Sequence, residues 1–342
     1  MRVIEIRKHG ASDQAFGIAE RPTPKYNDDD VLIKVKTFGI NFADVLARLG
    51  VYPDAPPLPS VIGYEVAGKV EAVGSKVTSL KPGDHVLAMT RFGGYAEKVV
   101  TPAYGVMKIP GDISAVEAAA LPVNGLTAYH CLYEMVKVRE GDRVLIHAAA
   151  GGVGNIAVQL AKHLGAEVFG TCGSDEKVEH LKKMGVHHAI NYREKDYEKE
   201  IREITNGEGI DIILDSLAGP NIRKELRLLR AAGRLIVFGV AAVMGSRGRN
   251  IPKLLWAYLR AKRFMALNLL MDSKAVIGVN ALRISEQRPD LAAAEMKEFF
   301  NLYQQGVVKP VISKTFHFDE IAKAHDFLES RQSIGKIIVT TD

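Results

Sequence analysis

Short apolar stretches separated by glycine and proline fill the first hundred residues, and each has the length of a strand. The first six residues, MRVIEI, alternate like a strand. A turn of sequence KPGD at 81–84 separates two of these stretches. We therefore expect a strand-rich N-terminal region with strands at 31–36, 65–73, 85–88 and 95–100.

From residue 142 onward the pattern changes, because apolar runs alternate with amphipathic stretches of helical length. Such alternation predicts a parallel sheet with helices on both faces. The first strand should begin at Val144, and the others should lie at 167–171, 188–190, 210–214, 234–238 and 275–279. The chain should close with a helix at 291–305, a strand at 310–316, a helix at 319–328 and a strand at 336–339. The predicted fold class is α/β, a doubly wound parallel sheet together with a strand-rich region.

A glycine-rich turn follows the first strand of the alternating region and matches the dinucleotide pattern G-x-G-x-x-G, with alanine in the first position. Glycine at 151 lets the backbone approach a pyrophosphate, and glycine at 154 lets helix and strand pack closely. The first N–H groups of the next helix, 155–164, have no internal partner and would meet the anion. Gly165 ends that helix. The residues expected to hold the cofactor here are Ala149, Gly151, Gly152, Val153 and Gly154.

Length and composition indicate the number of domains and the cellular compartment but do not indicate a function. At 342 residues the chain is long enough for two domains. It has no apolar run of about 18 residues and no signal-peptide core, so no membrane-spanning helix is expected. Its two cysteines, Cys131 and Cys172, cannot build a disulfide framework, which indicates a reducing, cytoplasmic setting. The net charge of +5 suits an anionic cofactor as well as nucleic acid or a membrane and decides nothing.

Several phrases of the sequence, together with the turn and the order of elements, resemble the medium-chain dehydrogenase/reductase superfamily, specifically its zinc-free quinone oxidoreductase branch. The phrases are GINFAD at 39–44, GYEVAG at 63–68, KPGD at 81–84 and GLTA at 125–128. The segment 249–264, around Trp256, is most similar to the vesicle amine transport protein subfamily. The resemblance implies a discontinuous GroES-like catalytic domain at 1–123 and 285–342, a Rossmann dinucleotide-binding domain at 124–284, and an active site between them.

Zinc-dependent relatives in this superfamily hold a catalytic zinc with cysteine, histidine and a second cysteine or an acid. The matching positions of this chain carry Asn41, Tyr64 and Asn124, none of which is a normal zinc ligand. Glu65 alone cannot make a site, and we interpret the histidine pair at 187–188 as surface or packing residues. We therefore expect no metal. Without a Lewis acid, reduction of an already polarised acceptor is favoured over alcohol oxidation.

The choice between NADPH and NADH depends on the end of the second strand of the alternating region. An acid about 20 residues beyond the turn normally binds the adenosine ribose and selects NAD, and none stands there. Ser174 is the predicted N-cap of the next helix, where Asp175 suits the helix dipole. The resemblance implies that Ser174 and Lys177 hold the 2′-phosphate of NADPH beside Gly173, with Tyr192 against it. We expect NADPH; Asp175 bending back to the ribose would favour NADH instead.

The nicotinamide end of the cofactor should meet residues from several parts of the chain. The resemblance implies that Asn41, Asn124 and Thr127 line it, and the alternative for Asn41 is a turn residue without contact to the cofactor. The backbone after the fifth strand of the alternating region is expected at the carboxamide, through Phe238, Gly239 and Val240.

The expected reaction is hydride transfer from NADPH to a quinone or to the β-carbon of an enone, with the protein positioning the two reactants. An enone also needs a proton from a nearby acid. Tyr52 matches the proton-donating tyrosine of the related enoyl thioester reductases, and its alternative role is to shape the pocket. Tyr64 is a second candidate or fills the space of the lost zinc ligand. Quinones can take protons from water. The catalytic candidates are therefore Tyr52, Asn41 and Tyr64.

The segment 249–264 belongs to a stretch with one apolar helical face, formed by residues 251, 254, 255, 258 and 259. It would cover the substrate cleft, pack on a second subunit or lie on a membrane surface. We favour packing, because a peripheral membrane binder usually needs a second signal. A homodimer is expected from the resemblance. The competing function is a non-catalytic NADPH-binding protein that acts through a membrane surface or a protein partner. Nucleic-acid binding is not expected, because the basic residues are not concentrated beside a stacking platform.

Overall fold

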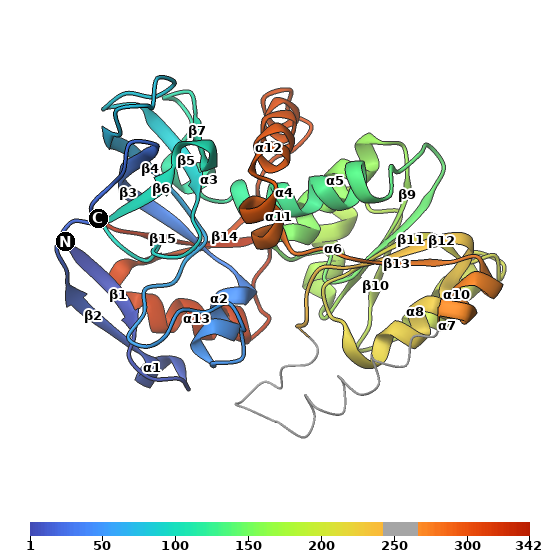
Figure 1. Ribbon diagram of the computed structural model, residues 1–342. Coiled ribbons are helices and arrows are strands. Elements are labelled where there is room, and N and C mark those ends of the chain that lie inside the picture. Colours follow the sequence, from blue (N-terminus) through green and yellow to red (C-terminus); the bar gives the residue numbers. More distant parts are fainter. Residues whose placement is uncertain (242–265) are drawn as a thin grey trace. The chain divides into compact units, whose positions relative to one another are not determined.

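The computed structural model describes residues 1–241 and 266–342 and divides into two compact units. The first unit consists of Met1–Leu126, Ala281–Glu298 and Pro310–Asp342, and the second of Thr127–Asn280 and Phe299–Lys309. Figure 1 labels the elements of both units. The segment 249–264, to which the sequence drew attention, lies outside the described residues.

The first unit is strand-rich. Its strands are β1 (Arg2–Ile6), β2 (Phe16–Glu20), β3 (Asp30–Ile40), β4 (Glu65–Val73), β5 (His85–Met89), β6 (Lys98–Pro102), β7 (Val106–Lys108), β14 (Ile312–His317) and β15 (Lys336–Thr340). Strands β1 and β2 form a separate pair, and the larger sheet has the order β14-β15-β3-β4-β5-β7, with β6 paired to β3. The C-terminal strand β15 lies antiparallel to β3, with Ile338 opposite Gly39. This pairing makes the unit discontinuous in sequence.

Short helices complete the first unit. They are α1 (Ser12–Ala15), α2 (Phe42–Arg48), α3 (Ala115–Ala118), α11 (Ala281–Gln287) and α13 (Ile321–Glu329). Two further helices, α4 (Pro122–Tyr129) and α12 (Pro289–Gln304), begin in the first unit and end in the second.

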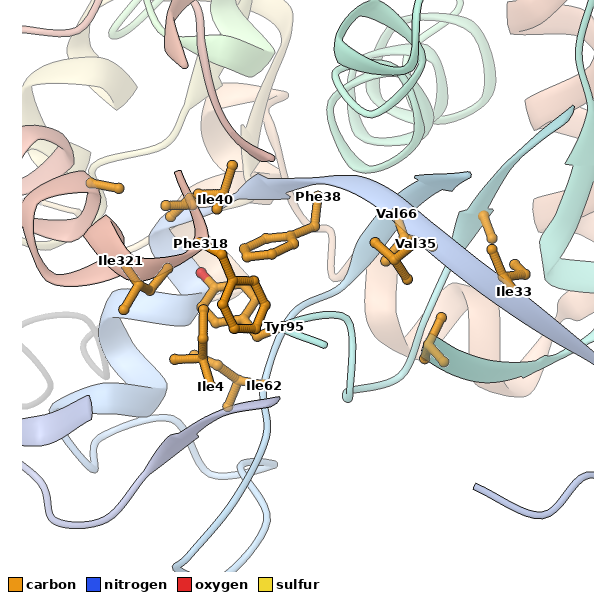
Figure 2. Packing of buried hydrophobic residues seen from close by; sticks show 14 of the residues in the cluster. Ile4, Ile33, Val35, Phe38, Ile40, Ile62, Val66, Tyr95, Phe318 and Ile321 are labelled. Carbon is orange, nitrogen blue, oxygen red and sulfur yellow. The ribbon is translucent and has the colours of Figure 1, made fainter. Parts of the chain in front are cut away.

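The core of the first unit follows from strand alternation and three aromatic rings. Along β3, Ile33 and Val35 are buried, whereas the lysines at 34 and 36 are exposed. Phe38 stacks on Tyr95 with ring centroids 4.6 Å apart, and Phe318 meets Phe38 edge-on. Figure 2 shows this cluster beneath β3. The contact with Phe318 ties the C-terminal part of the chain to the N-terminal sheet.

The second unit is a parallel sheet with helices. Its strands are β8 (Arg143–Ile146), β9 (Glu167–Cys172), β10 (His188–Asn191), β11 (Ile210–Asp215), β12 (Leu229–Val237) and β13 (Ala275–Gly278). Its helices are α5 (Gly152–His163), α6 (Asp175–Lys183), α7 (Tyr197–Ile204), α8 (Ile222–Leu228) and α10 (Ala266–Asp272), with a π-helical stretch at His130–Met135. The strand order is β10-β9-β8-β11-β12-β13, and every pair is parallel. The order reverses at β8, and open parallel sheets bind ligands at the carboxyl ends of strands at such a point.

The α/β fold class predicted from the sequence is confirmed, but several strand limits differ. The strand expected at 31–36 is longer and runs from Asp30 to Ile40. The strand expected at 95–100 begins only at Lys98, because the backbone of Tyr95 bonds to Ile4 and Ile62 instead of to β3. Strand β12 begins at Leu229 instead of 234. A register shift in its pairing with β11 separates this early part from the regular strand that the hydrophobic pattern predicts.

Candidate functional site

The turn between β8 and α5 is tightly closed. Ala148 has a φ of +50°, in the left-handed region, and its carbonyl oxygen accepts the Gly151 N–H at 2.8 Å. A Cβ on Gly154 would lie 2.4 Å from that same carbonyl oxygen and 2.7 Å from the backbone of Ala149. Only glycine at 154 therefore allows α5 to approach the turn this closely.

The N-terminus of α5 offers backbone donors to an anion. Gly151 is the N-cap, and its residue type leaves the helix without a side-chain cap. The N–H groups of Gly152 and Val153, the first two helical residues, have no intrahelical acceptor, and both residues are partly exposed. A phosphate at this end would gain both these N–H groups and the helix dipole.

A buried asparagine that the sequence analysis did not consider holds the turn from within. Asn155 is 1% exposed, and its Nδ2 donates to the carbonyl oxygens of Ala150 at 2.7 Å and Gly151 at 2.9 Å. Its Oδ1 lies 2.8 Å from Nε2 of His180, on α6. The sequence does carry a signal for this role: Asn155 is a polar residue on an otherwise apolar helix face, directly after Gly154.

The residues expected at the adenosine end come together at the carboxyl ends of β9 and β10. The Ser174 hydroxyl caps α6 by accepting the Lys177 N–H at 3.4 Å. A Cβ on Gly173 would lie 2.7 Å from the Tyr192 hydroxyl oxygen and 3.4 Å from Nε of Arg193. Gly173 thus leaves room for these two side chains, and Arg193 is a cationic neighbour that the sequence analysis did not name.

The backbone at 238–240 lies beside the carboxyl end of β11. The Phe238 N–H donates to the Asp215 carbonyl at 2.9 Å, and a Cβ on Gly239 would lie 2.6 Å from the Ser216 carbonyl oxygen. Val240 is 42% exposed. Because β8, β11 and β12 are adjacent and parallel, these residues lie at the same edge of the sheet as the glycine turn.

In the first unit, Asn41 belongs to a buried polar triad with Glu65 and Lys336. The Lys336 ammonium forms an ion pair with Glu65 and donates to Asn41 Oδ1 at 2.6 Å. Asn41 Nδ2 donates to Glu65 Oε1 at 2.8 Å, and the Val123 N–H donates to Glu65 Oε2 at 2.8 Å. Both ends of the Asn41 amide are therefore engaged, and it has one N–H and one lone pair left for a ligand.

A glycine makes room for this triad. A Cβ on Gly39 would lie 2.5 Å from Glu65 Oε1 and 2.6 Å from Lys336 Cε. Glu65 stands out in the sequence beside Tyr64, but Lys336 does not, since it opens the closing strand 295 positions after Asn41. No local pattern indicates a partner at that separation.

Asp44 lies next to the triad and is fully buried. Its Oδ2 accepts the Asn41 N–H at 2.7 Å, which completes a capping box at the start of α2. Burial raises the pKa of the Asp44 carboxyl to about 7, although the Asn41 N–H and the Lys336 charge oppose the shift. A carboxyl of this kind changes its charge near neutral pH.

The two candidate tyrosines contact each other in the same unit. The rings of Tyr52 and Tyr64 meet edge-on with centroids 6.1 Å apart, and Phe92 also packs against Tyr64, with centroids 5.4 Å apart. The Tyr64 hydroxyl is buried and has no hydrogen-bond partner among the described residues. Burial raises the pKa of Tyr52, and nearby Asp54 raises it further. Tyr52, like any tyrosine of ordinary or raised pKa, is protonated at neutral pH.

The remaining predicted residues occupy buried positions. Asn124 is 3% exposed and donates from Nδ2 to the Ala120 carbonyl at 3.5 Å, while Thr127 is 7% exposed.

The histidine pair has packing partners: His187 Nδ1 accepts the Val168 N–H, and His188 Nε2 lies 2.8 Å from Glu167 Oε1. Within residues 1–241 and 266–342, no three His, Cys, Asp or Glu side chains are grouped as metal ligands.

None of the helices within the two described ranges is long and apolar enough to cross a membrane.

Family models match both units of the chain. Residues 27–111 match the model described as alcohol dehydrogenase GroES-like domain, and residues 152–295 match the one described as zinc-binding dehydrogenase. These matches agree with the strand-rich first unit and the parallel sheet of the second.

Individual relatives match along the whole chain. The chain is 36% identical over 342 residues to the synaptic vesicle membrane protein VAT-1 homolog of Danio rerio, covering 100% of this chain and 70% of that protein. It is 35% identical over 341 residues to 2-haloacrylate reductase of Burkholderia sp, covering 98% and 97%. The structure matches that of Escherichia coli quinone oxidoreductase complexed with NADPH with a TM-score of 0.86 at 30% identity, covering 100% of both chains. The chain therefore belongs to the medium-chain dehydrogenase/reductase superfamily, close to the VAT-1 homologs and the quinone oxidoreductases.

Proposed function

We propose that this protein is an NADPH-dependent oxidoreductase that delivers a hydride to a quinone or to an α,β-unsaturated carbonyl compound without the help of zinc. The observation that carries the proposal is the closed turn at 148–154, where the uncapped N-terminus of α5 faces outward at the switch point of a parallel sheet. Two relatives support the chemistry by name, a quinone oxidoreductase complexed with NADPH and a 2-haloacrylate reductase.

The residues present fit a phosphorylated dinucleotide, because α5 begins without a side-chain cap and Gly173 leaves room for the Tyr192 hydroxyl and for Arg193. The N–H groups of Gly152 and Val153 would bind the pyrophosphate. Ser174, Lys177 and Tyr192 would bind the 2′-phosphate above Gly173. The nicotinamide end would meet Asn124, Thr127 and the backbone of Phe238, Gly239 and Val240. NADPH, when bound, supplies the hydride, and the chain supplies position.

In the first unit, Asn41 is the candidate that orients the reacting groups. Its amide is held on one side by Lys336 and on the other by Glu65, so its direction does not depend on a bound ligand. A side chain fixed by such partners positions a reactant with little further loss of entropy.

An enone needs a proton at the α-carbon or at the enolate oxygen. Tyr52 is the first candidate to donate it, because it is only partly buried and a phenol is protonated at neutral pH. Tyr64 is the second candidate. A quinone would not depend on either residue, since water can supply its protons.

Independence from zinc is proposed from the chemistry of the donors. The positions that match the zinc ligands of relatives carry two amides and a phenol, and the neighbouring carboxylate of Glu65 is paired with the Lys336 ammonium. Metal analysis of the purified protein should find far less than one zinc per chain, and activity should survive a chelator. Stoichiometric zinc whose removal abolishes activity would contradict this part.

We further propose a cytoplasmic homodimer. Two cysteines, Cys131 and Cys172, are too few for a disulfide framework, which is typical of proteins of a reducing compartment. Strand β13 forms one edge of the second unit's sheet, where a second copy could pair. Sedimentation velocity should give the mass of two chains, and a monomer at micromolar concentration would contradict the dimer.

The central test is turnover of NADPH with a panel of quinones and short enones. Lys177→Ala should weaken NADPH binding at least about tenfold and leave NADH binding unchanged, because it removes one partner of the 2′-phosphate and nothing that NADH would contact. Gly154→Ala should weaken both cofactors. Gly111→Ala is its matched control, since a Cβ at 111 meets nothing within 4 Å.

The results of this test also separate the alternative function. NADPH binding without turnover of any acceptor would favour a non-catalytic role. Similarity to a protein named as a synaptic vesicle membrane protein makes a membrane surface the partner to test first. Co-sedimentation with anionic lipid vesicles would then identify a membrane surface as the partner.

A further inference from the structure

Two acids, Asp175 and Glu176, stand in the first turn of α6, at the adenosine end of the proposed cofactor site, and the first of them has a partner in the neighbouring strand. Asp175 is the first residue of α6, directly after the Ser174 cap. A carboxylate that reaches the ribose accepts its hydroxyl groups and favours a cofactor without a 2′-phosphate. The same charge would repel a 2′-phosphate. The position of the Asp175 carboxylate therefore bears directly on which cofactor the site prefers.

The structure shows what holds that carboxylate. Asn191, the last residue of β10, donates from Nδ2 to Asp175 Oδ1 at 2.8 Å. Asn191 is 8% exposed, so this hydrogen bond is shielded on the amide side. If Asp175 moved away, the buried Asn191 amide would lose its acceptor without gaining water, which costs free energy. This cost keeps the Asp175 carboxylate in place.

The other end of the same amide orders the loop that follows β10. Asn191 Oδ1 accepts the Arg193 N–H at 3.1 Å, and the Asn191 carbonyl accepts the Lys195 N–H at 3.0 Å. One side chain thus connects the acid of α6 to the loop that carries Tyr192 and Arg193.

That loop brings two side chains over Gly173. A Cβ on Gly173 would lie 2.7 Å from the Tyr192 hydroxyl oxygen and 3.4 Å from Arg193 Nε. A hydroxyl donor and a guanidinium group therefore both lie beside Gly173. Arg193 is exposed, and its side chain forms no ion pair with an acid in the described parts of the chain. Guanidinium groups bind phosphate with charge-assisted hydrogen bonds.

We propose that Asn191 is a specificity-determining residue, which favours NADPH over NADH by holding Asp175 away from the ribose 2′ position and presenting Tyr192 and Arg193 to the 2′-phosphate. The proposal rests on the cofactor site of the proposed function. Asn191 acts through its neighbours and does not itself touch the phosphate, so it is a positioning residue.

The test uses two fragments that differ only in the 2′-phosphate, 2′,5′-ADP and 5′-AMP, with affinities measured by calorimetry. The full-length parent should prefer 2′,5′-ADP. Asn191→Ala should reduce that preference about tenfold, because it releases Asp175. Adding Asp175→Asn to Asn191→Ala should restore part of the preference, since the released side chain then carries no charge, while the loop still lacks the hydrogen bond from Asn191.

An exposed variant tests the loop without disturbing the buried amide. Arg193→Gln should weaken 2′,5′-ADP about tenfold and leave 5′-AMP unchanged. The matched control is Lys195→Gln, because Lys195 is exposed on the same loop and already pairs with Glu200. This variant keeps the proposal falsifiable if Asn191→Ala fails to fold.

Equal loss of both fragments in Asn191→Ala would show a merely structural role and would overturn the proposal. So would a preference that Asp175→Asn does not restore even in part, unchanged binding in Arg193→Gln, or a parent that does not prefer 2′,5′-ADP. The fragments lack nicotinamide, so a protein that reduces no quinone or enone can still give the expected pattern. Conversely, an active reductase without this pattern would contradict only the role of Asn191.

Discussion

Lys336 and Glu65 form an ion pair inside the first unit, with side chains only 4% and 0% exposed. The pair is completed by Asn41, which accepts from Lys336 and donates to Glu65. Each partner of a buried ion pair stabilises the fold only in the presence of the other. Removal of one leaves an uncompensated charge in a medium of low polarity. This relationship gives the first two predictions.

Replacement of Lys336 by methionine should destabilise the protein by about 3–5 kcal/mol, because Glu65 would keep a buried charge without its partner. Urea unfolding at neutral pH measures the change. The double variant Lys336→Met, Glu65→Gln should recover much of the loss, since it removes both charges. A single variant as stable as the parent, or a double variant less stable than the single, would contradict the buried pair.

Gly39→Ala should destabilise the first unit by about 1–3 kcal/mol, because the added Cβ would overlap Glu65 Oε1 and Lys336 Cε and force the triad apart. Thermal unfolding measures the effect, with Gly111→Ala as the control of equal chemical change in open space. Equal melting temperatures for the two variants would show that the triad adjusts freely.

Asp44→Asn should change how stability depends on pH. The folded state keeps a proton on Asp44 up to a pKa of about 7, whereas the unfolded chain releases it above the ordinary 3.8. Asp44 therefore lowers stability as pH rises between these values. The stability of the variant relative to the parent should be about 2–3 kcal/mol greater at pH 8 than at pH 5.

The comparison between variant and parent is needed because another carboxyl titrates in the same range. Burial raises the pKa of Asp215 in the second unit to about 7 as well, and nearby Glu225 adds to the shift. Asp215 contributes equally to both proteins, so the difference isolates Asp44. A difference that does not change between pH 5 and pH 8 would refute the assignment.

Tyr52→Phe should lower kcat with enones about a hundredfold and leave kcat with quinones nearly unchanged, because only the enone takes its proton from the protein. Parallel steady-state assays with both classes of acceptor measure the difference. Tyr104→Phe, at a site 54% exposed, is the control. Equal losses for both acceptors would assign Tyr52 to pocket shape instead of proton transfer.

Much of the fold was predictable from the sequence because its signals are local. The helix after the glycine turn and the Ser174 cap of α6 are set by residues within a few positions of each other. The strand at 65–73 is likewise marked by its apolar pattern and has these bounds in the structure. The late start of β6 was not predictable, since it depends on backbone partners of Tyr95 far away in the chain, Ile4 in β1 and Ile62 in a loop.

By itself, the sequence determined the alternation of strands and helices and the turn with Gly151 and Gly154, since hydrophobic period and turn chemistry act over short distances. Only the tertiary structure decided that Lys336 neutralises Glu65 and orients Asn41, and that Asn191 holds Asp175. Lys336 reaches its partners because β15 pairs with β3, and Asn191 reaches Asp175 because β10 lies beside β9. Strand neighbours far apart in sequence are chosen by the packing of the whole sheet, and no local pattern records that choice.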